Sequence, residues 1–317
     1  MSKLTKIAVT GAAGFIGSNI CDELLSHGSY EIIAIDDLST GRVQNVPIAN
    51  GEKLQFHRTT ILDLDSMKQL FKDVEYVIHQ AAIPSVPKSI EDPIGTTNAN
   101  IMGTLNVLVA AKECKVKRVV LASSSSVYGN NPILPQVESM ETGPISPYAT
   151  SKLVNELHAK QFYDLYSLET VALRYFNVFG PKQNPKSEYA AVIPKFIAKI
   201  TNGESPTIFG DGSATRDFSY VKDVVGANLL ALKAPKAACG KAFNISGGKP
   251  IRIDQLVETL NKLMGKKIKP KYEKERKGDI KHSYADMSLA KKYLGHNPKY
   301  SLESGLIETI KWFEKHE

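Results

Sequence analysis

The chemistry that this sequence could perform centres on Tyr148 and Lys152, which lie four residues apart. Ser146 and Pro147 predict a helix start just before them, because serine is a favoured N-cap and proline fits the first helical position. Residues four apart on a helix share one face, so the ammonium can lie beside the phenol. At about 5 Å and an effective dielectric of about 20, one cation favours phenolate by about 3 kcal/mol. The spacing therefore predicts a tyrosine base tuned by the lysine and by a second cation.

Three glycines, Gly11, Gly14 and Gly17, stand between a first predicted strand and the helix after it. In this spacing the first permits a tight turn, the second lets backbone approach a pyrophosphate, and the third lets helix and strand pack closely. Asp36 ends the next predicted strand, where a carboxylate accepts hydrogen bonds from a ribose. A carboxylate there repels a 2′-phosphate, so we predict NAD rather than NADP. Its oxidised nicotinamide would be the second cation beside Tyr148.

Ser124 is a third candidate for the chemistry, since it follows a predicted strand at 118–122. Its hydroxyl can donate and accept hydrogen bonds, so it could pass a proton between a substrate alcohol and Tyr148. Ser124 lies in a run of four serines, however, and such a run could also be only a loop.

The elements that must position these side chains alternate between strands and helices. Helices are predicted at 15–25, at 98–112 and from Pro147 onwards. This alternation is typical of an α/β protein with a doubly wound parallel (Rossmann) sheet, whose right-handed crossovers bring the carboxyl ends of the strands to one edge. The predicted strands are 6–10, 31–36, 54–58, 75–80, 118–122 and 170–174.

The pattern changes after residue 180, where a polar loop and amphipathic helices replace the alternation. Those helices are predicted at 192–200, 254–264 and 302–315. We therefore expect two domains. An NAD-binding Rossmann domain would comprise residues 1–180 and about 217–246, and a smaller C-terminal α/β domain for the substrate would comprise 181–216 and 247–317.

Composition narrows the class of protein. The 317 residues contain 42% hydrophobic residues and three cysteines far apart in the chain, which argues against a disulfide framework or a metal site and favours the cytoplasm. We find no apolar signal core and no run long enough to span a membrane. The net charge of +7 includes a lysine-rich stretch at 262–281. With Tyr272 as its single aromatic residue, that stretch favours a solvated face or a polyanionic small substrate over a nucleic acid.

Four segments together resemble one known family. In their order and separations they are similar to the extended short-chain dehydrogenase/reductase family, and more narrowly to its NAD-dependent UDP-sugar 4-epimerases. The likeness extends over essentially the whole chain. The segments are Gly11-x-x-Gly14-x-x-Gly17, Ser124-x-x-Val127-Tyr128-Gly129, Tyr148-x-x-x-Lys152 and Arg174-Tyr175-Phe176-Asn177.

The resemblance implies an isomerase that keeps NAD bound throughout catalysis. Tyr148 would take the proton of the sugar 4-hydroxyl while the C4 hydride passes to the nicotinamide, and a 4-keto sugar would then turn so that the hydride returns to its other face. Ser124 would bridge the hydroxyl and the phenol, and Lys152 would hold the ribose. The resemblance assigns NAD binding to Gly11, Gly14, Phe15, Ile16, Gly17, Asp36, Asp37, Ser39, Asp63, Leu64, Gln80, Ala81, Ala82, Asn100, Tyr148, Lys152 and Tyr175.

The resemblance also implies contacts to the UDP-sugar. Asn177, Arg216 and Arg276 match positions beside the diphosphate, where an arginine fork suits a charged, bidentate partner. Asp279 matches the partner of the uridine ribose. Val192, Thr207 and Phe209 match the uracil pocket. The full set of substrate-binding positions is Ser124, Asn177, Val192, Thr207, Phe209, Arg216, Arg276, Asp279 and Ser283.

Two departures from the glucose-specific pattern indicate the subgroup. Ser283 stands where glucose-restricted members carry a tyrosine, which leaves room for a 2-acetamido group, and Ala191 replaces a usual asparagine. Ser283 and Ala191 both resemble the residues found at these positions in enzymes that prefer UDP-N-acetylglucosamine. We therefore expect UDP-N-acetylglucosamine and UDP-N-acetylgalactosamine as substrates, together with UDP-glucose and UDP-galactose. Related enzymes dimerise through two helices, here 98–113 and 147–166, so a homodimer is expected.

Other functions of the same fold remain as alternatives. Dehydratases and UDP-glucuronate decarboxylases have acidic residues after the reactive serine, where this chain has Ser125 and Ser126. UDP-glucuronate 4-epimerases share the serine run, but tend to lack the match to Asn177 and need a cation for the carboxylate. A non-catalytic NAD-binding regulator or a nucleic-acid-binding protein is the alternative from another class, and such a protein has no need of a base such as Tyr148.

Overall fold

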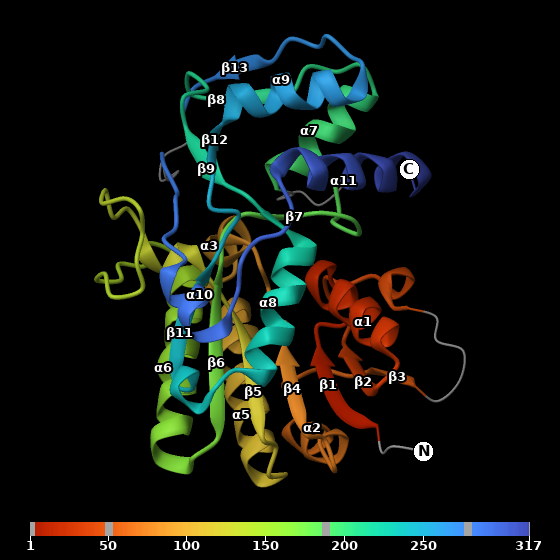
Figure 1. Ribbon diagram of the computed structural model, residues 1–317, viewed down its shortest axis with the longest axis vertical. Helices are drawn as coiled ribbons and strands as arrows, with labels where there is room; N and C mark the ends of the chain where they lie inside the picture. Colours follow the sequence, from red (N-terminus) through yellow and green to blue (C-terminus); the bar gives the residue numbers. More distant parts are fainter. Residues whose placement is uncertain (1–3, 48–52, 186–190, 276–280, 317) are drawn as a thin grey trace.

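Seven parallel strands form the central sheet of the protein (Figure 1). The computed structural model describes residues 4–47, 53–185, 191–275 and 281–316. The strands follow the order β11-β6-β5-β4-β1-β2-β3, and each neighbouring pair is parallel, as in the predicted doubly wound sheet. They are β1 (Thr5–Thr10), β2 (Tyr30–Asp36), β3 (Leu54–Arg58), β4 (Tyr76–His79), β5 (Arg118–Ser124), β6 (Glu169–Tyr175) and β11 (Lys241–Ile245).

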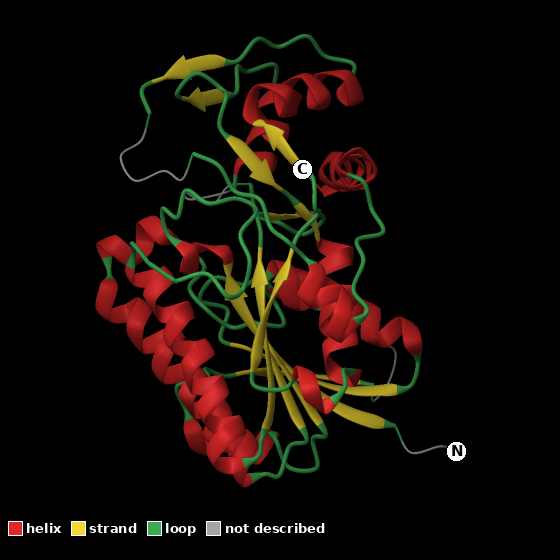
Figure 2. Cartoon of the chain, turned by 60° about the vertical axis from the view of Figure 1, so that its left-hand side comes forward, coloured by secondary structure: helices red, strands yellow, loops and turns green. Residues whose placement is uncertain are grey.

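Alternate residues of the strands enter two separate cores, because successive side chains of a strand point to opposite faces. Val9 and Ala34 belong to one core, whereas Ala8 and Ile33 belong to the other. Helices cover both faces of the sheet (Figure 2). The first core is covered by α1 (Phe15–His27) and α8 (Val221–Lys233), and the second by α2 (Leu64–Leu70), α5 (Gly103–Glu113) and α6 (Pro147–Tyr166).

The helix predicted at 98–112 is divided in the structure. Its first residues, Asn98–Met102, form a π-helical turn, η2, and α5 begins at Gly103. Two short helices precede this turn, α3 (Val86–Glu91) and α4 (Pro93–Thr97). Short 3-10 turns are η1 (Val43–Asn45), η3 (Ser125–Tyr128) and η4 (Lys236–Ala238).

A second layer lies above the carboxyl edge of the sheet (Figure 1). Its helices are amphipathic, as predicted, and α9 buries Leu256, Val257 and Leu260 on one face. Its paired strands are short. The layer contains α7 (Val192–Thr201), α9 (Ile253–Met264), α11 (Leu302–His316), the parallel pair β8 (Thr207–Phe209) with β13 (Lys271–Glu273), and the antiparallel pair β9 (Thr215–Asp217) with β12 (Pro250–Arg252).

The segment 217–246 returns to the sheet, as the sequence predicts. It supplies α8 and then β11, which pairs with β6 at the edge of the sheet. Two further elements join the layers, since β7 (Val178–Phe179) pairs with β10 (Ser219–Tyr220) and α10 (Ser288–Leu294) packs against β11 and α8. One hydrophobic core is continuous from the sheet into α7, α9 and α11. Among the described residues, we find no helix both long and apolar enough to cross a membrane.

Candidate active site

Tyr148 and Lys152 lie in the first turns of α6, and this helix starts where the sequence predicts. The Ser146 hydroxyl accepts a hydrogen bond from the Ala149 backbone N–H at 3.2 Å, and Pro147 occupies the first turn. The Lys152 Nζ lies 5.9 Å from the centre of the Tyr148 ring. The two side chains therefore share one helix face, as their spacing predicts.

The charges around Tyr148 differ from the sequence-based prediction. Burial raises the pKa of the Tyr148 phenol, and a hydrogen bond with Ser124 lowers that pKa only in part. Burial lowers the pKa of Lys152 to about 8, and its ammonium donates to the backbone carbonyl of Ala122 at 3.0 Å. The shift of the phenol pKa is thus opposite in sign to the one predicted from the lysine alone, because desolvation outweighs the hydrogen bond with Ser124.

Ser124 ends β5 and caps the short turn η3, so the serine run is ordered structure rather than a loose loop. Its hydroxyl oxygen accepts from the Ser126 backbone N–H at 3.2 Å and from the Ser126 hydroxyl at 2.9 Å. Its own proton is directed to the Tyr148 phenol, since a hydrogen bond from Ser124 favours the phenolate. Ser124 and Tyr148 together can receive a proton from an alcohol placed between them.

The glycine turn after β1 is shaped to receive a pyrophosphate. Gly11 has a φ of +70°, and a Cβ there would lie 2.7 Å from the Ala81 nitrogen. A Cβ on Gly17 would lie 2.1 Å from the Gly11 carbonyl oxygen. Gly14 is the N-cap of α1, whose first turn carries no acidic residue, so its N–H groups favour an anion. These residues fit the dinucleotide that the sequence predicts.

Asp36 lies beside this turn at the carboxyl end of β2. Its carboxylate accepts from the Ala13 N–H at 2.9 Å and from the Leu38 N–H at 2.8 Å, and burial raises its pKa. Asp37 accepts from the Ser39 N–H at 2.8 Å on the exposed side of the same loop. The three residues of this loop that are predicted to bind NAD, Asp36, Asp37 and Ser39, therefore lie together near Gly11–Gly17.

Other positions assigned to NAD also hold the protein together. The Gln80 amide donates to the Tyr175 hydroxyl at 3.1 Å, and Asn228 donates to the same hydroxyl at 2.8 Å. Burial raises the pKa of Tyr175 to about 12, so this phenol is a neutral hydrogen-bonding group. Asn100 accepts from the Ile83 N–H at 2.8 Å and so fixes the loop after β4.

Asp63 is exposed and caps α2, accepting from the Ser66 N–H at 3.0 Å and from the Ser66 hydroxyl at 2.6 Å. The hydrogen bonds from Ser66 lower the pKa of this carboxyl. Leu64 follows as the first residue of the same helix. The apolar positions assigned to NAD are half-buried, and they are Phe15, Ile16, Leu64, Ala81 and Ala82.

A pocket of about 370 Å³ lies between α7, β8 and β9. It gathers five positions that the resemblance assigns to the substrate, although they come from distant parts of the chain. The Arg216 guanidinium is held by the backbone carbonyls of Thr215 and Lys281 at 2.9 Å and 3.1 Å. The five residues are Asn177, Val192, Thr207, Phe209 and Arg216, and Ala191 lines the same pocket.

Asn177, which lines this pocket, contacts Ser283, which is not itself among the lining residues. The Asn177 side-chain amide donates to the Ser283 hydroxyl at 3.1 Å and to the Asp217 carbonyl at 2.9 Å. Ser283 is buried. Arg276 and Asp279 lie outside the described residues.

The sequence did not predict several residues of this pocket. Lys195 and Phe196 follow Val192 by three and four residues in α7, so helical spacing could have placed them on the same face. Ile253, the first residue of α9, and Lys281, between β13 and α10, also line the pocket. No local sequence pattern predicts that these two residues reach the pocket.

Comparisons with known proteins agree with this geometry. The model of the NAD dependent epimerase/dehydratase family matches residues 7–246. The chain is 37% identical to the UDP-glucose 4-epimerase of Mycolicibacterium smegmatis, over 96% of this chain and 97% of that protein.

Two solved structures are similar throughout. The UDP-N-acetylglucosamine 4-epimerase of Methanobrevibacter ruminantium M1, in complex with UDP-N-acetylmuramic acid, is 42% identical with a TM-score of 0.95, covering 99% of this chain and 100% of that chain. The UDP-glucuronic acid 4-epimerase of Bacillus cereus, in complex with UDP-glucuronic acid and NAD, is 34% identical with a TM-score of 0.90 over 99% of this chain and 100% of that chain.

Proposed function

Because the chain belongs to the NAD-dependent epimerase/dehydratase family and is a UDP-sugar 4-epimerase, we propose that it interconverts UDP-N-acetylglucosamine and UDP-N-acetylgalactosamine. UDP-glucose and UDP-galactose are the further substrates of this proposal. The observation that carries it is Ser283, a small buried side chain that is hydrogen-bonded to Asn177, which lines the pocket. A tyrosine in its place would occupy the space that a 2-acetamido group needs.

In this proposal the residues at the carboxyl ends of the strands bind NAD. The turn at Gly11–Gly17 holds the pyrophosphate, and Asp36 accepts hydrogen bonds from the adenine ribose. When bound there, NAD would supply the hydride acceptor and donor for sugar C4. A positively charged nicotinamide near Tyr148 would favour the phenolate and so oppose the burial that raises the pKa of Tyr148.

The chain's own groups move the proton. The Tyr148 phenolate takes the proton of the 4-hydroxyl, and the Ser124 hydroxyl bridges the two oxygens. Lys152 keeps a positive charge behind the phenol while its ammonium is anchored on the Ala122 carbonyl. The same tyrosine returns the proton when the sugar is reduced on its other face.

The pocket beneath α7 binds the nucleotide in this proposal. Val192, Thr207 and Phe209 surround the uracil, and Arg216 with Asn177 contacts the diphosphate. Lys195 and Lys281 add positive charge to the same pocket, which suits a polyanion. Tight binding of the nucleotide leaves the sugar free to turn.

The expected division into domains remains part of the proposal. Residues 1–180 and about 217–246 would bind NAD, and 181–216 with 247–317 would bind the UDP-sugar. A homodimer is also proposed, supported by exposed apolar side chains on α6 and the neighbouring turn η2, which are Met102, Leu157, Leu165 and Tyr166. The three cysteines are free thiols, which supports a reducing compartment such as the cytoplasm.

The test is to incubate the purified protein, without added NAD, with UDP-N-acetylglucosamine, UDP-N-acetylgalactosamine, UDP-glucose and UDP-glucuronic acid in turn. Proton NMR reads the configuration at C4 in each reaction. We expect turnover of the first three. Turnover of UDP-glucuronic acid alone would establish the alternative 4-epimerase, and no turnover of any UDP-sugar would favour the non-catalytic alternative.

A further inference from the structure

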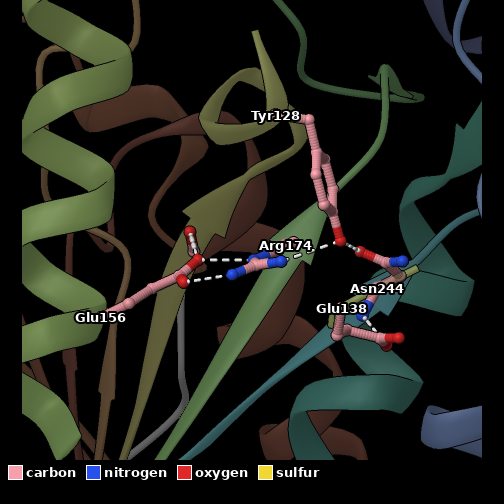
Figure 3. Close-up of polar contacts among 6 residues, drawn as sticks. Tyr128, Glu138, Glu156, Arg174 and Asn244 are labelled. Carbon is pink, nitrogen blue, oxygen red and sulfur yellow. Dashed lines mark hydrogen bonds and ion pairs between the residues drawn. The ribbon is translucent and has the colours of Figure 1, made fainter. Parts of the chain in front are cut away.

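A buried polar network joins side chains of β6, α6, η3 and β11 (Figure 3). At its centre is Arg174, near the end of β6, which is 5% exposed. Its guanidinium forms a fork with Glu156 of α6, with Nε 2.9 Å from Oε1 and Nη2 2.7 Å from Oε2. Neither residue has a part in the reaction proposed above.

The remaining arm of the guanidinium reaches a different element. Arg174 Nη1 donates to the Tyr128 hydroxyl at 2.8 Å, and that hydroxyl donates to Asn244 Oδ1 at 2.7 Å. The Arg174 guanidinium also lies 4.8 Å from the centre of the Tyr128 ring. Arg174 thus holds α6 with one side and the end of η3 with the other, as the dashed lines of Figure 3 show.

Both elements carry a catalytic candidate. Glu156 lies eight residues after Tyr148 on α6, so the two share a helix face two turns apart. Tyr128 ends the turn η3 that Ser124 caps. The Ser123 hydroxyl also donates to Glu156, which ties the residue before Ser124 to the same carboxylate.

We propose that Arg174 is a positioning residue, which sets the alignment of the Ser124 hydroxyl with the Tyr148 phenol by holding Glu156 and Tyr128 at once. The inference rests on the proposed function in one respect, which is that the aligned Ser124 and Tyr148 transfer the proton of the sugar 4-hydroxyl. The alignment itself affects the Tyr148 pKa, because the hydrogen bond from Ser124 is the interaction that lowers it. We call the bonds of Arg174 to Glu156 and Tyr128 the clamp. Loss of the clamp should weaken the hydrogen bond from Ser124 and raise the Tyr148 pKa.

An arginine is suited to this task and a lysine is not. A guanidinium donates in three directions within one plane, so it can hold a carboxylate and a hydroxyl in fixed relation, whereas an ammonium is a point charge on a flexible stem. Arg174→Lys therefore keeps the buried charge opposite Glu156 but loses the fixed geometry. The substitution separates the role of the charge from that of the clamp.

The chain offers a matched control in Arg118 at the amino end of β5, which is 4% exposed. Its Nε and Nη2 contact Glu169 at 2.9 Å and 2.6 Å, and its Nη1 donates to the Ala231 carbonyl at 2.8 Å. This buried arginine–glutamate pair is about 20 Å from Ser124 along the strand. Arg118→Lys therefore disturbs a similar pair without reaching the site.

The experiment compares Arg174→Lys with Arg118→Lys in two ways. The first is steady-state kinetics on the UDP-sugar that the wild type turns over, with the pH profile of kcat. The second needs no turnover, because ultraviolet difference titration against the same protein carrying Tyr148→Phe isolates the ionisation of Tyr148. Thermal denaturation of both variants shows how far each substitution destabilises the fold.

We expect Arg174→Lys to lower kcat about tenfold or more, since small misplacements of catalytic groups have large effects, with KM changed less than about twofold. The acidic limb of its kcat profile and the Tyr148 titration should both move to higher pH. Arg118→Lys should leave kcat, the acidic limb of the kcat profile and the Tyr148 titration unchanged. Equal effects of the two substitutions, or a Tyr148 titration that does not move, would overturn the proposal.

Tyr128→Phe provides a second variant should Arg174→Lys not fold. It removes one hydroxyl from the clamp and leaves the pair with Glu156 intact, so we expect a smaller shift of the Tyr148 titration in the same direction. Tyr220→Phe is its control, because Tyr220 is also buried and its hydroxyl contacts Glu308 at 2.7 Å, away from Tyr148. An unshifted titration in Tyr128→Phe would contradict the clamp. If the wild type turns over no UDP-sugar, the proposed function fails while the titration still decides the inference.

Discussion

Asn177 and Ser283 are hydrogen-bonded to each other at 3.1 Å, although 106 residues separate them in the chain. Asn177 leaves β6 with a positive φ of 39°, a backbone conformation that asparagine tolerates better than most residues. The bond joins a residue of the proposed diphosphate site to the residue proposed to discriminate between sugars. Substitutions at position 283 should therefore act first on the choice of sugar.

Ser283→Tyr should abolish turnover of the N-acetylated UDP-sugars and spare UDP-glucose. The phenol ring cannot fit between Asn177 and Asp217, so it must turn toward the sugar and take the volume of the acetamido group. Ser283→Ala is the matched control, which removes the hydroxyl without adding volume and should retain both activities. Rates on the two substrates, measured side by side by NMR, check this. A proportionate loss of both in Ser283→Tyr would show that residue 283 does not select the sugar.

Tyr148→Phe should lower kcat by a factor of about 10² to 10⁴, because it removes the proposed general base and leaves the ring. NAD released from the denatured protein should equal that of the wild type. Tyr220→Phe, which removes a buried hydroxyl elsewhere, should remain active. Interconversion at the wild-type rate by Tyr148→Phe would remove the phenol from the mechanism.

Gly17→Ala should destabilise the protein by about 1–3 kcal/mol and reduce the NAD retained on purification. The reason is the 2.1 Å approach of the added Cβ to the Gly11 carbonyl oxygen, which would force the turn to move. Gly226→Ala in α8 is the control, since its Cβ would meet no atom within 4 Å and alanine favours a helix by up to about 1 kcal/mol. Melting temperatures and bound NAD distinguish the two. Equal melting temperatures and equal amounts of bound NAD in the two variants would contradict the proposed role of the glycine turn in holding the pyrophosphate.

Lys152 should make stability depend on alkaline pH in protein freed of NAD. Burial lowers its folded-state pKa to about 8, whereas the unfolded chain keeps this proton up to about pH 10.4. The unfavourable burial of charge is therefore fully present below pH 8 and is relieved as the pH rises to about 10.4, by up to about 3 kcal/mol. Relative to Lys152→Met, the wild type should become more stable over that window in denaturant titrations. If the free energies of unfolding of the wild type and Lys152→Met changed in parallel with pH, the prediction would be contradicted.

The sheet could be predicted from the sequence because its signals are local. Apolar strand segments, the glycine turn and the Ser146–Pro147 helix start are each contained in a few residues, and the structure confirms them. The division of 98–112 into a π-helical turn and α5 could not be predicted in this way. Asn100 within that turn bonds to Ile83 and to Ser151, and such tertiary contacts leave no periodic pattern.

The electrostatics of the site were the harder part to predict. Spacing places Lys152 beside Tyr148, but it carries no information on burial, which reverses the expected shift of the phenol pKa. The clamp around Arg174 was equally hidden, because its partners Glu156, Tyr128 and Asn244 come from three different elements. Such arrangements arise only when the chain has folded.

The hydrophobic core that continues from the sheet into α7, α9 and α11 has a consequence for how the sugar is turned over. Layers that share one apolar interior resist rotation about a hinge, since any opening would expose apolar surface to water. In the proposed reaction, the half-turn between the two faces of C4 would then come from torsion within the ligand itself, while the protein remains a stationary frame around it.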